Sequence, residues 1–562
     1  MNFKTNGVMR TTIHSFVPAK LTIGTFALLF SFSVSSNYQT ILGSQEHYLP
    51  DFSYAGYDFG SEIPNRTNAT IIDVTAYGAL PNDGIDDSKS VSKAMEVAHK
   101  TKGPVVVSFP EGRFVLRDVI RIERSHLTLR GAGMGDGGTE LYFPMPLRLI
   151  DKSPVLNELR KYLTDNNKRQ RTKALNIDLP FSEYSWSGGV IWIQKPGTRA
   201  VKYLEEFDKP ITNLADIKQG KRGDLNLIVK RNKNLQVGDV LQIHWHNRQG
   251  ENGKLIDAIY GKTDLKIGSR HWTSPARPLV KQTTKIISVD GNRVEIADPL
   301  LHDINEQLPA NFASWEYIEE VGVEGFHIKF PQSDSYGHHL ELGFNGVFLT
   351  SAFNSWIRDL KTTEAEAAII TENSASVTID NVHTKGEKIA HYSIYLGGVH
   401  NFLVRDLHVF NRPIHSISVN TRATKGVYLR AQVYQLPKLD QHAGANHQNL
   451  FDSTTLHINA QRDEQGPFYH LWDGSGAKYW QPGHGQFNTT WNTKVVVQSG
   501  ADYSETVRLI GAAEGPNARI VGVHGNRKFE VEYFPTPYYE SINDIPSVPS
   551  LYEYQKSLRK SD

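Results

Sequence analysis

Side chains that can transfer protons concentrate between residues 327 and 492. The segments "YGHHLELGFNG", "TTEAEAA", "KGEKIAHYSIY", "NRPIHSISV", "LDQHAGANHQNLF" and "HLWDGSG" follow one another there. Unpaired buried charges are costly, so a convergence of such groups on one face indicates a site. The residues that we single out are, in chain order, His339, Glu341, Glu366, His391, Tyr392, Arg412, His415, Asp440, His442 and Trp472.

These residue types suit the cleavage of a uronic-acid polysaccharide by β-elimination. A cation or amide must neutralise the carboxylate, a base must take the C5 proton, and an acid must protonate the leaving oxygen. The segments "KGEKIAHY" and "NRPIHS" supply His, Tyr, Arg and Lys for these tasks. We predict a lyase in which Tyr392 or His415 removes the proton and Arg412 stabilises the developing charge. The other seven residues are predicted to bind the substrate or to tune the base.

Two other functions remain open for the same residues. A glycoside hydrolase needs two carboxyl groups roughly 5 to 9.5 Å apart. Glu341, Glu364, Glu366 and Asp440 could supply such a pair. The excess of His and Arg over carboxylates favours the lyase. A non-catalytic glycan-binding protein is the second alternative, because sugars stack on flat rings such as that of Trp472.

The sequence predicts no metal ligands and no cofactor. His338 and His339 are adjacent, and neighbouring side chains on a strand point to opposite faces, so we expect no joint metal site. The absence of cysteine excludes thiolate ligands and disulfides. Binding of Ca²⁺ through oxygen ligands remains open.

A repeat of short strands would position these residues. Similar strands contain apolar residues at Ile357, Ile379, Val404, Leu429 and Phe451, at spacings of 22, 25, 25 and 22. This period is typical of a three-sided coil of parallel strands, in which each coil rises roughly 4.8 Å. We therefore predict an all-β, right-handed parallel β-helix in which these five side chains form one interior column. Alignment on this repeat places Glu366, Tyr392 and His415 one coil apart on one face.

The N-terminal part carries the most specific motifs. "DVTAYGALPNDGIDDSKSVSKAM" and "FPEGRFVL" resemble the pectate-lyase-like β-helix superfamily, and the later segments resemble its secreted polysaccharide-active branch. Residues 91–98 read as a short amphipathic helix that can cover the open end of the stack, and the resemblance implies a polysaccharide substrate. The calcium-binding aspartates and catalytic arginine motif of ordinary pectate lyases have no match here, nor do the paired aspartates of polygalacturonases. The usual substrate of the superfamily is therefore not assumed.

Composition and patterning divide the 562-residue chain into five expected parts. Residues 1–36 read as a signal peptide, because basic residues precede a short apolar run. Residues 37–199 should form the N-terminal cap and first coils, 200–310 an inserted β unit, 311–500 the coils that carry the site, and 501–562 a C-terminal cap.

The signal and the charge together predict the setting in which the protein acts. The formal net charge is +1, which gives no global attraction to nucleic acid. We expect a secreted or periplasmic monomer with a polysaccharide as its partner. We expect no membrane association after removal of the signal.

Overall fold

The computed structural model describes residues 48–152, 160–161, 164–165, 180–198, 212–231, 235–247, 253–261, 265–269, 271–273, 275, 277–474, 476, 480–483, 485–512, 515–535 and 537–560. The chain divides into two compact units, Met1–Leu49 and Pro50–Asp562. Every described helix and strand belongs to the second unit. The expected signal peptide lies outside the described residues. Within them, no helix is both long and apolar enough to cross a membrane.

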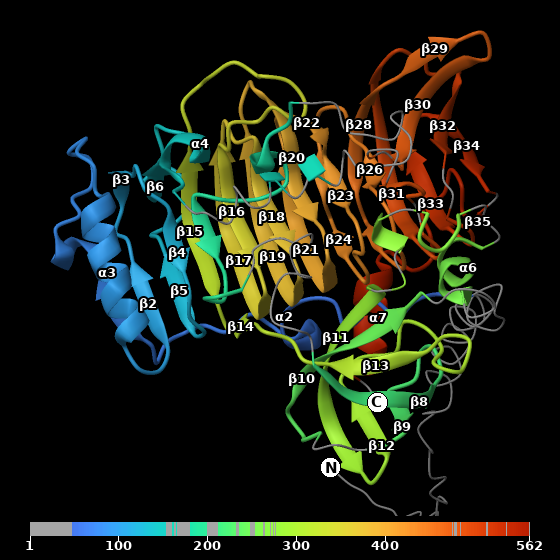
Figure 1. Ribbon diagram of the computed structural model, residues 1–562. Helices are drawn as coiled ribbons and strands as arrows, with labels where there is room; N and C mark the ends of the chain where they lie inside the picture. Colours follow the sequence, from blue (N-terminus) through green and yellow to red (C-terminus); the bar gives the residue numbers. More distant parts are fainter. Residues whose placement is uncertain are drawn as a thin grey trace, which may run out of the picture. The chain divides into compact units, whose positions relative to one another are not determined.

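Two large sheets make the body of the second unit (Figure 1). The first has 17 strands: β1 Thr70–Asp73, β2 Val105–Ser108, β3 Gly112–Val115, β5 Leu127–Arg130, β6 Thr139–Tyr142, β14 Ile318–Glu319, β15 Gly322–Lys329, β17 Ala352–Thr363, β19 Ser374–Lys385, β21 Val399–Val409, β24 Val427–Leu429, β25 Gln432–Val433, β27 Leu450–Asp452, β28 Thr455–Asn459, β31 Thr489–Ser499, β33 Arg519–Gly525 and β35 Tyr538–Glu540. The second has 12: β4 Ile120–Ile122, β7 Ile191–Ile193, β16 Asn345–Thr350, β18 Ala367–Glu372, β20 Ile389–Leu396, β22 Arg412–His415, β23 Ile417–Val419, β26 Leu439–Gln441, β29 Gln461–Asp463, β30 Gly466–Asp473, β32 Thr506–Ala512 and β34 Lys528–Phe534.

Successive coils pair in parallel, so the fold is a parallel β-helix, as the sequence predicts. The long strands of the first sheet bend near their middle. β15, β17 and β19 each skip one pairing there, at Gly325, Asp359 and Asn381, whose φ angles are 76°, 52° and 51°. Gly, Asn and Asp adopt positive φ more readily than other residues. The bend gives two faces and the second sheet gives a third, which makes each coil three-sided.

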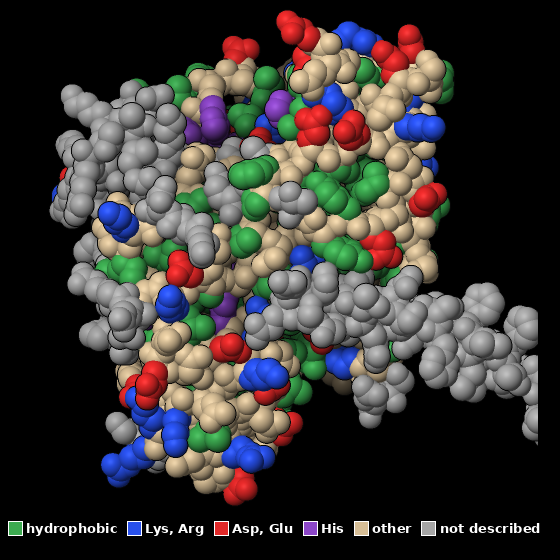
Figure 2. All heavy atoms as spheres, turned by 90° about the vertical axis from the view of Figure 1, so that its right-hand side faces the viewer, with side chains coloured by type: hydrophobic (Ala, Val, Ile, Leu, Met, Phe, Trp, Pro, Cys, Tyr) green, Lys and Arg blue, Asp and Glu red, His purple; other side chains and the backbone are tan. Residues whose placement is uncertain are grey.

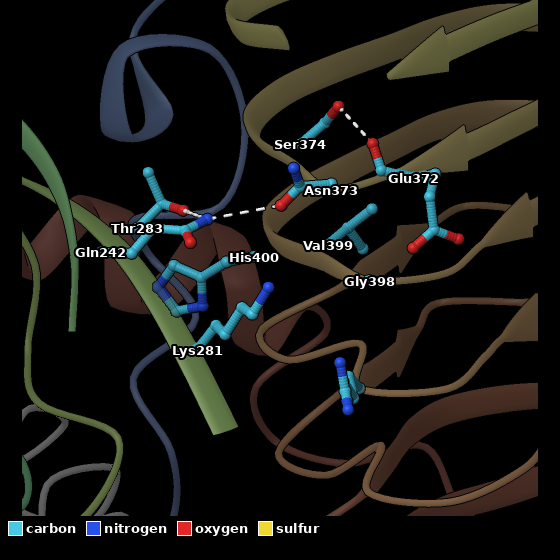
Figure 3. Close-up of a pocket in the computed structure, with 10 residues that line it drawn as sticks. Gln242, Lys281, Thr283, Glu372, Asn373, Ser374, Gly398, Val399 and His400 are labelled. Atoms are coloured by element: carbon cyan, nitrogen blue, oxygen red, sulfur yellow. Dashed lines mark hydrogen bonds between the residues drawn. The ribbon is translucent and has the colours of Figure 1, made fainter. Parts of the chain in front are cut away.

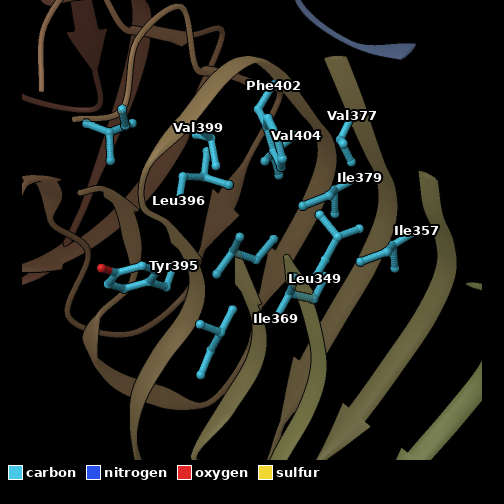
Figure 4. Close-up of a cluster of buried hydrophobic side chains, with 14 of the residues drawn as sticks. Leu349, Ile357, Ile369, Val377, Ile379, Tyr395, Leu396, Val399, Phe402 and Val404 are labelled. Atoms are coloured by element: carbon cyan, nitrogen blue, oxygen red, sulfur yellow. The ribbon is translucent and has the colours of Figure 1, made fainter. Parts of the chain in front are cut away.

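A column of apolar side chains runs through the interior (Figure 4). The strand register stacks Ile357, Ile379, Val404, Tyr428 and Phe451 in succession. All five are at most 1% exposed. The sequence expectation is therefore correct at four positions and wrong at Leu429. Leu429 pairs with Arg405 instead, and a shift of one residue moves a strand side chain to the opposite face.

One helix covers the first strands of the stack. In α3, Ser88–Lys100, the side chains of Val91, Ala94, Met95 and Ala98 are buried at helical spacing. The helix contacts β1, β2 and β4, at the blue end of the ribbon in Figure 1. The other short helices are α2 Tyr57–Gly60, α4 Leu147–Ile150 and α6 Lys254–Tyr260, with 3₁₀ turns η2 Val74–Tyr77, η4 Glu183–Ser185 and η7 His271–Thr273.

A closed antiparallel barrel interrupts the stack between β7 and β14. Its six strands are β8 Asn213–Gly220, β9 Asn226–Val229, β10 Val240–His246, β11 Pro278–Asp290, β12 Arg293–Ile296 and β13 Ala310–Ala313. The inserted unit expected over 200–310 thus corresponds to a barrel rather than to further coils. Its Gly-Asp and Asp-Gly turns connect antiparallel strands in the usual way.

The C-terminal segment differs from the expected cap. β32, β33, β34 and β35 pair in parallel with preceding strands, so the coils continue past residue 500. Only α7, Leu551–Arg559, leaves the stack. It lies along the flank, because the backbone N–H of Tyr552 donates to Asp452 at 2.8 Å and its hydroxyl donates to the carbonyl of Ala55 at 3.0 Å.

Candidate active site

Tyr392 and His415 lie side by side on neighbouring coils. In the second sheet, β18 pairs β20 with Ala367 opposite Tyr392, and β20 pairs β22 with Tyr392 opposite His415. The two rings stack with centroids 4.7 Å apart and planes 22° apart. On the other side of Tyr392, the ring of His391 stacks at 4.2 Å. Burial raises the pKa of the Tyr392 hydroxyl far above its ordinary value, and the charges of Asp440 and Glu341 raise it further.

His391 is held by a buried carboxylate. Its Nδ1 lies 3.0 Å from Oε1 of Glu341, which also accepts from the backbone N–H of His339 at 3.1 Å. The hydroxyl of Ser185 donates to the other oxygen of Glu341. Burial opposes ionisation of Glu341, but the charge and hydrogen bond of His391 outweigh it and lower the pKa to about 2. Glu341 is therefore ionised, and its two oxygens are engaged by His391, Ser185 and the backbone of His339.

His415 has an equivalent arrangement with Asp440. Its Nδ1 lies 2.9 Å from Oδ2 of Asp440, and Nδ1 of His442 lies 3.4 Å from Oδ1. Burial raises the pKa of Asp440, but His442 and His415 outweigh that effect and hold it below its ordinary value. Burial lowers the pKa of His415 to about 4, so its imidazole is neutral near pH 7. Nε2 of His415 is buried without a hydrogen-bond partner among the described residues.

A turn brings two further histidines over these strands. Residues 331–344 contain no strand, and His339 has φ 68°. The rings of His338 and His339 therefore lie on the same side, 3.8 Å apart, whereas a strand would separate them. Nε2 of His338 lies 3.1 Å from Nε2 of His391. Burial lowers the pKa of His338 to about 3 and that of His339 to about 4.

These contacts place several ligand atoms close enough to hold one ion. A ring nitrogen from each of His338, His391 and His415 lies within 4.8 Å of the others. His415, Asp440 and His442 form a second such group. Figure 2 shows histidine side chains gathered beside a hollow at the upper edge of the face turned to the viewer.

Two other carboxylates hold the backbone of neighbouring turns. Glu366 accepts from the N–H groups of Gly343 at 2.7 Å and Phe344 at 2.9 Å, and is 3% exposed. Burial raises its pKa, against the charge of Lys388 and these hydrogen bonds. Glu364 accepts from the N–H groups of Glu387 at 2.9 Å and Lys388 at 3.2 Å. The structure therefore places Glu366 as an anchor of the turn, which corrects its expected role in substrate binding.

Two predicted residues lie apart from the cluster. Arg412 is an exposed residue of β22, three positions before His415, and alternation along a strand puts the two side chains on opposite faces. Among the described residues it forms no hydrogen bond or ion pair with the cluster. Trp472 is 2% exposed, and its Nε1 donates to Thr490 at 3.0 Å in the facing sheet. It is a core residue, which corrects the prediction that it contacts sugar.

His338 and Ser185 also belong to the cluster, although neither is among the predicted site residues. His338 was excluded by assuming a strand, although "YGHHLELG" has a glycine near each end, which favours a turn. Ser185 lies in η4, within a segment that carries no chemical motif, and only the fold brings it to Glu341. The predicted residues that the structure does bring together are His339, Glu341, His391, Tyr392, His415, Asp440 and His442.

A small polar pocket lies elsewhere, where the barrel meets the coils (Figure 3). Gln242 of the barrel donates to Thr283 at 3.2 Å and to Asn373 of the coils at 3.5 Å. Nε2 of His400 lies 2.8 Å from the carboxylate of Asp298. These polar groups join the barrel to the coils, and we assign the pocket no catalytic role.

Comparison with known proteins adds no assignment of function. No family model and no curated protein matches the chain. Among solved structures, it is similar to the tailspike protein gp49 from Pseudomonas phage LKA1, with 11% identity, 85% of this chain and 82% of that chain covered, and a TM-score of 0.43. It is also similar to the gp54 tailspike of Acinetobacter baumannii bacteriophage AP22 in complex with a capsular saccharide, with 12% identity, coverage of 84% and 73%, and a TM-score of 0.33. DFA-IIIase from Arthrobacter chlorophenolicus A6 without its lid gives 11% identity, coverage of 85% and 100%, and a TM-score of 0.35.

Proposed function

We propose that the chain is a polysaccharide-degrading enzyme, and that it cleaves a uronic-acid-containing polysaccharide by β-elimination. The observation that carries this proposal is the histidine–tyrosine cluster around Tyr392 and His415, in which the neighbouring carboxylates are all engaged by protein groups. The resemblance of the N-terminal motifs to the pectate-lyase-like superfamily agrees with this class of substrate. We also propose that the protein is secreted, because residues 1–36 have the pattern of an export signal.

The hydrogen bonds and ion pairs of the carboxylates argue against a hydrolase. Hydrolysis by a carboxylate pair requires one acid and one base or nucleophile that face the glycosidic bond. Glu341 is engaged by Ser185 and His391, and Asp440 by His415 and His442. Glu364 and Glu366 accept backbone N–H groups, as described above. The groups left to transfer protons in the cluster are therefore imidazoles and the phenol of Tyr392.

An elimination at this cluster uses those groups as follows. A base takes the proton from C5 of the uronate, the C4–O4 bond breaks, and a C4=C5 double bond forms. The departing oxygen receives a proton from an acid of the cluster. Tyr392 and His415 stack directly on one another, so both can approach the same sugar ring. The position of Arg412 means that another group must neutralise the uronate carboxylate.

The first prediction is that His415→Ala and Tyr392→Phe each abolish most of the activity. A positioned acid or base contributes roughly 10²–10⁴-fold to the rate, so a loss of that size is expected. The assay offers anionic and neutral polysaccharides, and measures the ultraviolet absorbance of the new double bond together with new reducing ends.

His408→Ala is the matched control, because His408 lies on the first sheet, away from the cluster. It should retain wild-type activity. Reducing ends without the ultraviolet absorbance would contradict elimination and favour hydrolysis. Full activity in both cluster variants would move the site elsewhere on the molecule.

A further inference from the structure

We propose that His338, His391 and His415 bind one divalent transition-metal ion. Three nitrogen donors from three separate segments converge, as a metal site requires. Nε2 of His338 is 3.1 Å from Nε2 of His391, and a nitrogen of His415 lies within 4.8 Å of both. For Zn–N bonds of 2.0–2.1 Å, tetrahedral geometry places ligand nitrogens about 3.3 Å apart. Small ring movements bring the three donors to that spacing.

The surroundings of two of these rings are those of metal ligands. In metal sites, a histidine almost always presents its second ring nitrogen to a carboxylate, carbonyl or water, which fixes the ring and its tautomer. Nδ1 of His391 faces Glu341 at 3.0 Å, and Nδ1 of His415 faces Asp440 at 2.9 Å. Both contacts leave Nε2 as the donor available to an ion. The stacking of the strands does not by itself require a histidine–carboxylate pair on each of two adjacent coils, so the two pairs favour a metal site.

The unpaired nitrogen of His415 is an independent observation. His415 is 3% exposed, and its Nε2 has no hydrogen-bond partner among the described residues. Buried polar atoms are normally paired, so an unpaired one indicates a missing partner such as an ion or a water. A bound ion supplies that partner.

The donor set also indicates which metal the site takes. Imidazole nitrogens suit zinc, copper, iron and nickel, whereas Ca²⁺ takes oxygen ligands. Three protein ligands leave a coordination position open, as in catalytic rather than structural zinc sites. His338 lies on the exposed turn, so one ligand comes from a segment outside the sheets. The expectation of no metal site assumed a strand at His338, and the turn removes that assumption.

The ion also supplies the cation that elimination requires. This part of the inference rests on the proposed function: the open coordination position binds the carboxylate of the uronate, a task that Arg412 is not placed to perform. With His415 bound to the ion, Tyr392 is the residue of the stacked pair left to transfer a proton, and its raised pKa suits the acid that protonates the leaving oxygen.

Metal binding can be tested without any substrate. The purified chain is stripped with a chelator, and Zn²⁺ or Co²⁺ is added while heat release and visible Co²⁺ absorption are recorded. One ion per chain is expected. His391→Ala and His338→Ala should lose binding, and Glu341→Gln should weaken it about 10–100-fold. His408→Ala should bind like the wild type, and circular dichroism checks that each variant is folded.

The outcomes separate the metal site from the lyase. A wild-type chain that takes up neither ion overturns the metal site, even if it produces unsaturated sugars. Binding that a folded His391→Ala variant retains also overturns it. Binding that His391→Ala loses and His408→Ala keeps supports the site, even if no polysaccharide in the panel is cleaved. In the last case the proposed elimination fails and the metal site stands.

Discussion

Trp472 shows how the function of an aromatic residue depends on which face of its strand it occupies. Its indole reaches across the interior to Thr490, and its ring contacts Tyr533 edge to face with centroids 5.7 Å apart. Trp480 and Trp491 are also buried, at 6% and 4% exposure. None of these three rings is exposed, so none of them can stack on a sugar.

The second prediction follows from the burial of Trp472. Trp472→Ala should lower the free energy of unfolding by about 3–5 kcal/mol, because a buried aromatic ring leaves a cavity. Urea denaturation followed by circular dichroism measures this loss. A stable variant with weakened polysaccharide binding would show instead that Trp472 contacts the substrate.

Residue types and their spacing predicted most of the cluster, but not its geometry. "KGEKIAHY" and "NRPIHS" placed Tyr392 and His415 on adjacent coils because the repeat fixes their register. The same repeat misplaced Leu429 by one residue, since both Tyr428 and Leu429 are apolar. Alternation within β22 separates Arg412 from His415, a distinction that depends on knowing where the strand begins.

At the scale of elements, α7 depends on one buried carboxylate. Asp452 accepts from the hydroxyl of Ser550 and the N–H of Tyr552, both at 2.8 Å. Burial raises the pKa of Asp452 to about 7, although these hydrogen bonds lower it. The folded chain thus binds a proton here that the unfolded chain, with a pKa near 3.9, releases.

The third prediction is a loss of stability as the pH rises through this range. The contribution of Asp452 is complete below about pH 3.9 and disappears as the pH passes about 7, at roughly 1.4 kcal/mol for each unit of pKa difference. Asp452→Asn should remove this part of the slope. Denaturant unfolding of both proteins between pH 4 and 8 measures the difference, and equal slopes would contradict the assignment.

The bends between strand halves coincide with Asp and Asn residues that recur at the period of the coils. Asp359 and Asp406 occur in the repeated segment "RDL", and Asn381 occupies the same position in "IDNV". Each has positive φ, and the amide of Asn381 donates to Asp359 at 2.7 Å. Residues that tolerate this conformation recur at the coil period, so they could have located the bends.

At the scale of the whole second unit, histidines join the barrel to the coils. Nε2 of His302 in the barrel segment lies 2.8 Å from Nε2 of His447, and both rings are buried. Burial lowers the pKa of His447 to about 4, and it lowers that of His302 well below its ordinary value. The folded chain therefore keeps both rings neutral. Protonation of either ring would destabilise this junction.

The fourth prediction is acid destabilisation at this junction. The contribution of His447 is present above the unfolded pKa near 6.5 and is lost as the pH falls through about 4. His447→Gln cannot take up this proton and should flatten the acid slope of stability. Denaturant unfolding between pH 7 and 4 tests this, with His470→Gln at an exposed position as the control. An unchanged slope in His447→Gln would contradict it.

Periodicity predicted the fold class and the interruption of the stack, but not the nature of the interruption. Gly-Asp and Asp-Gly turns with alternating strands describe antiparallel pairing, which fits a barrel and an open sheet equally well. The barrel closes because β8 pairs with both β9 and β13. The pairing of β8 with β13 joins segments far apart in the sequence, so local patterns do not predict it. The end of the coils was placed too early, because β32–β35 lack the strand motif of the central repeats.

The position of the barrel in the chain affects the order in which the molecule folds. Central coils join partners 22 to 25 residues away, whereas Arg130 of β5 reaches Glu324 of β15 across 194 residues. Closing the longer loop costs about 2 kcal/mol more in chain entropy. A barrel that forms first brings the ends of this loop together and reduces that cost. We therefore expect the seam between the N-terminal coils and the rest of the stack to form last, with the central coils as the template onto which that end is added.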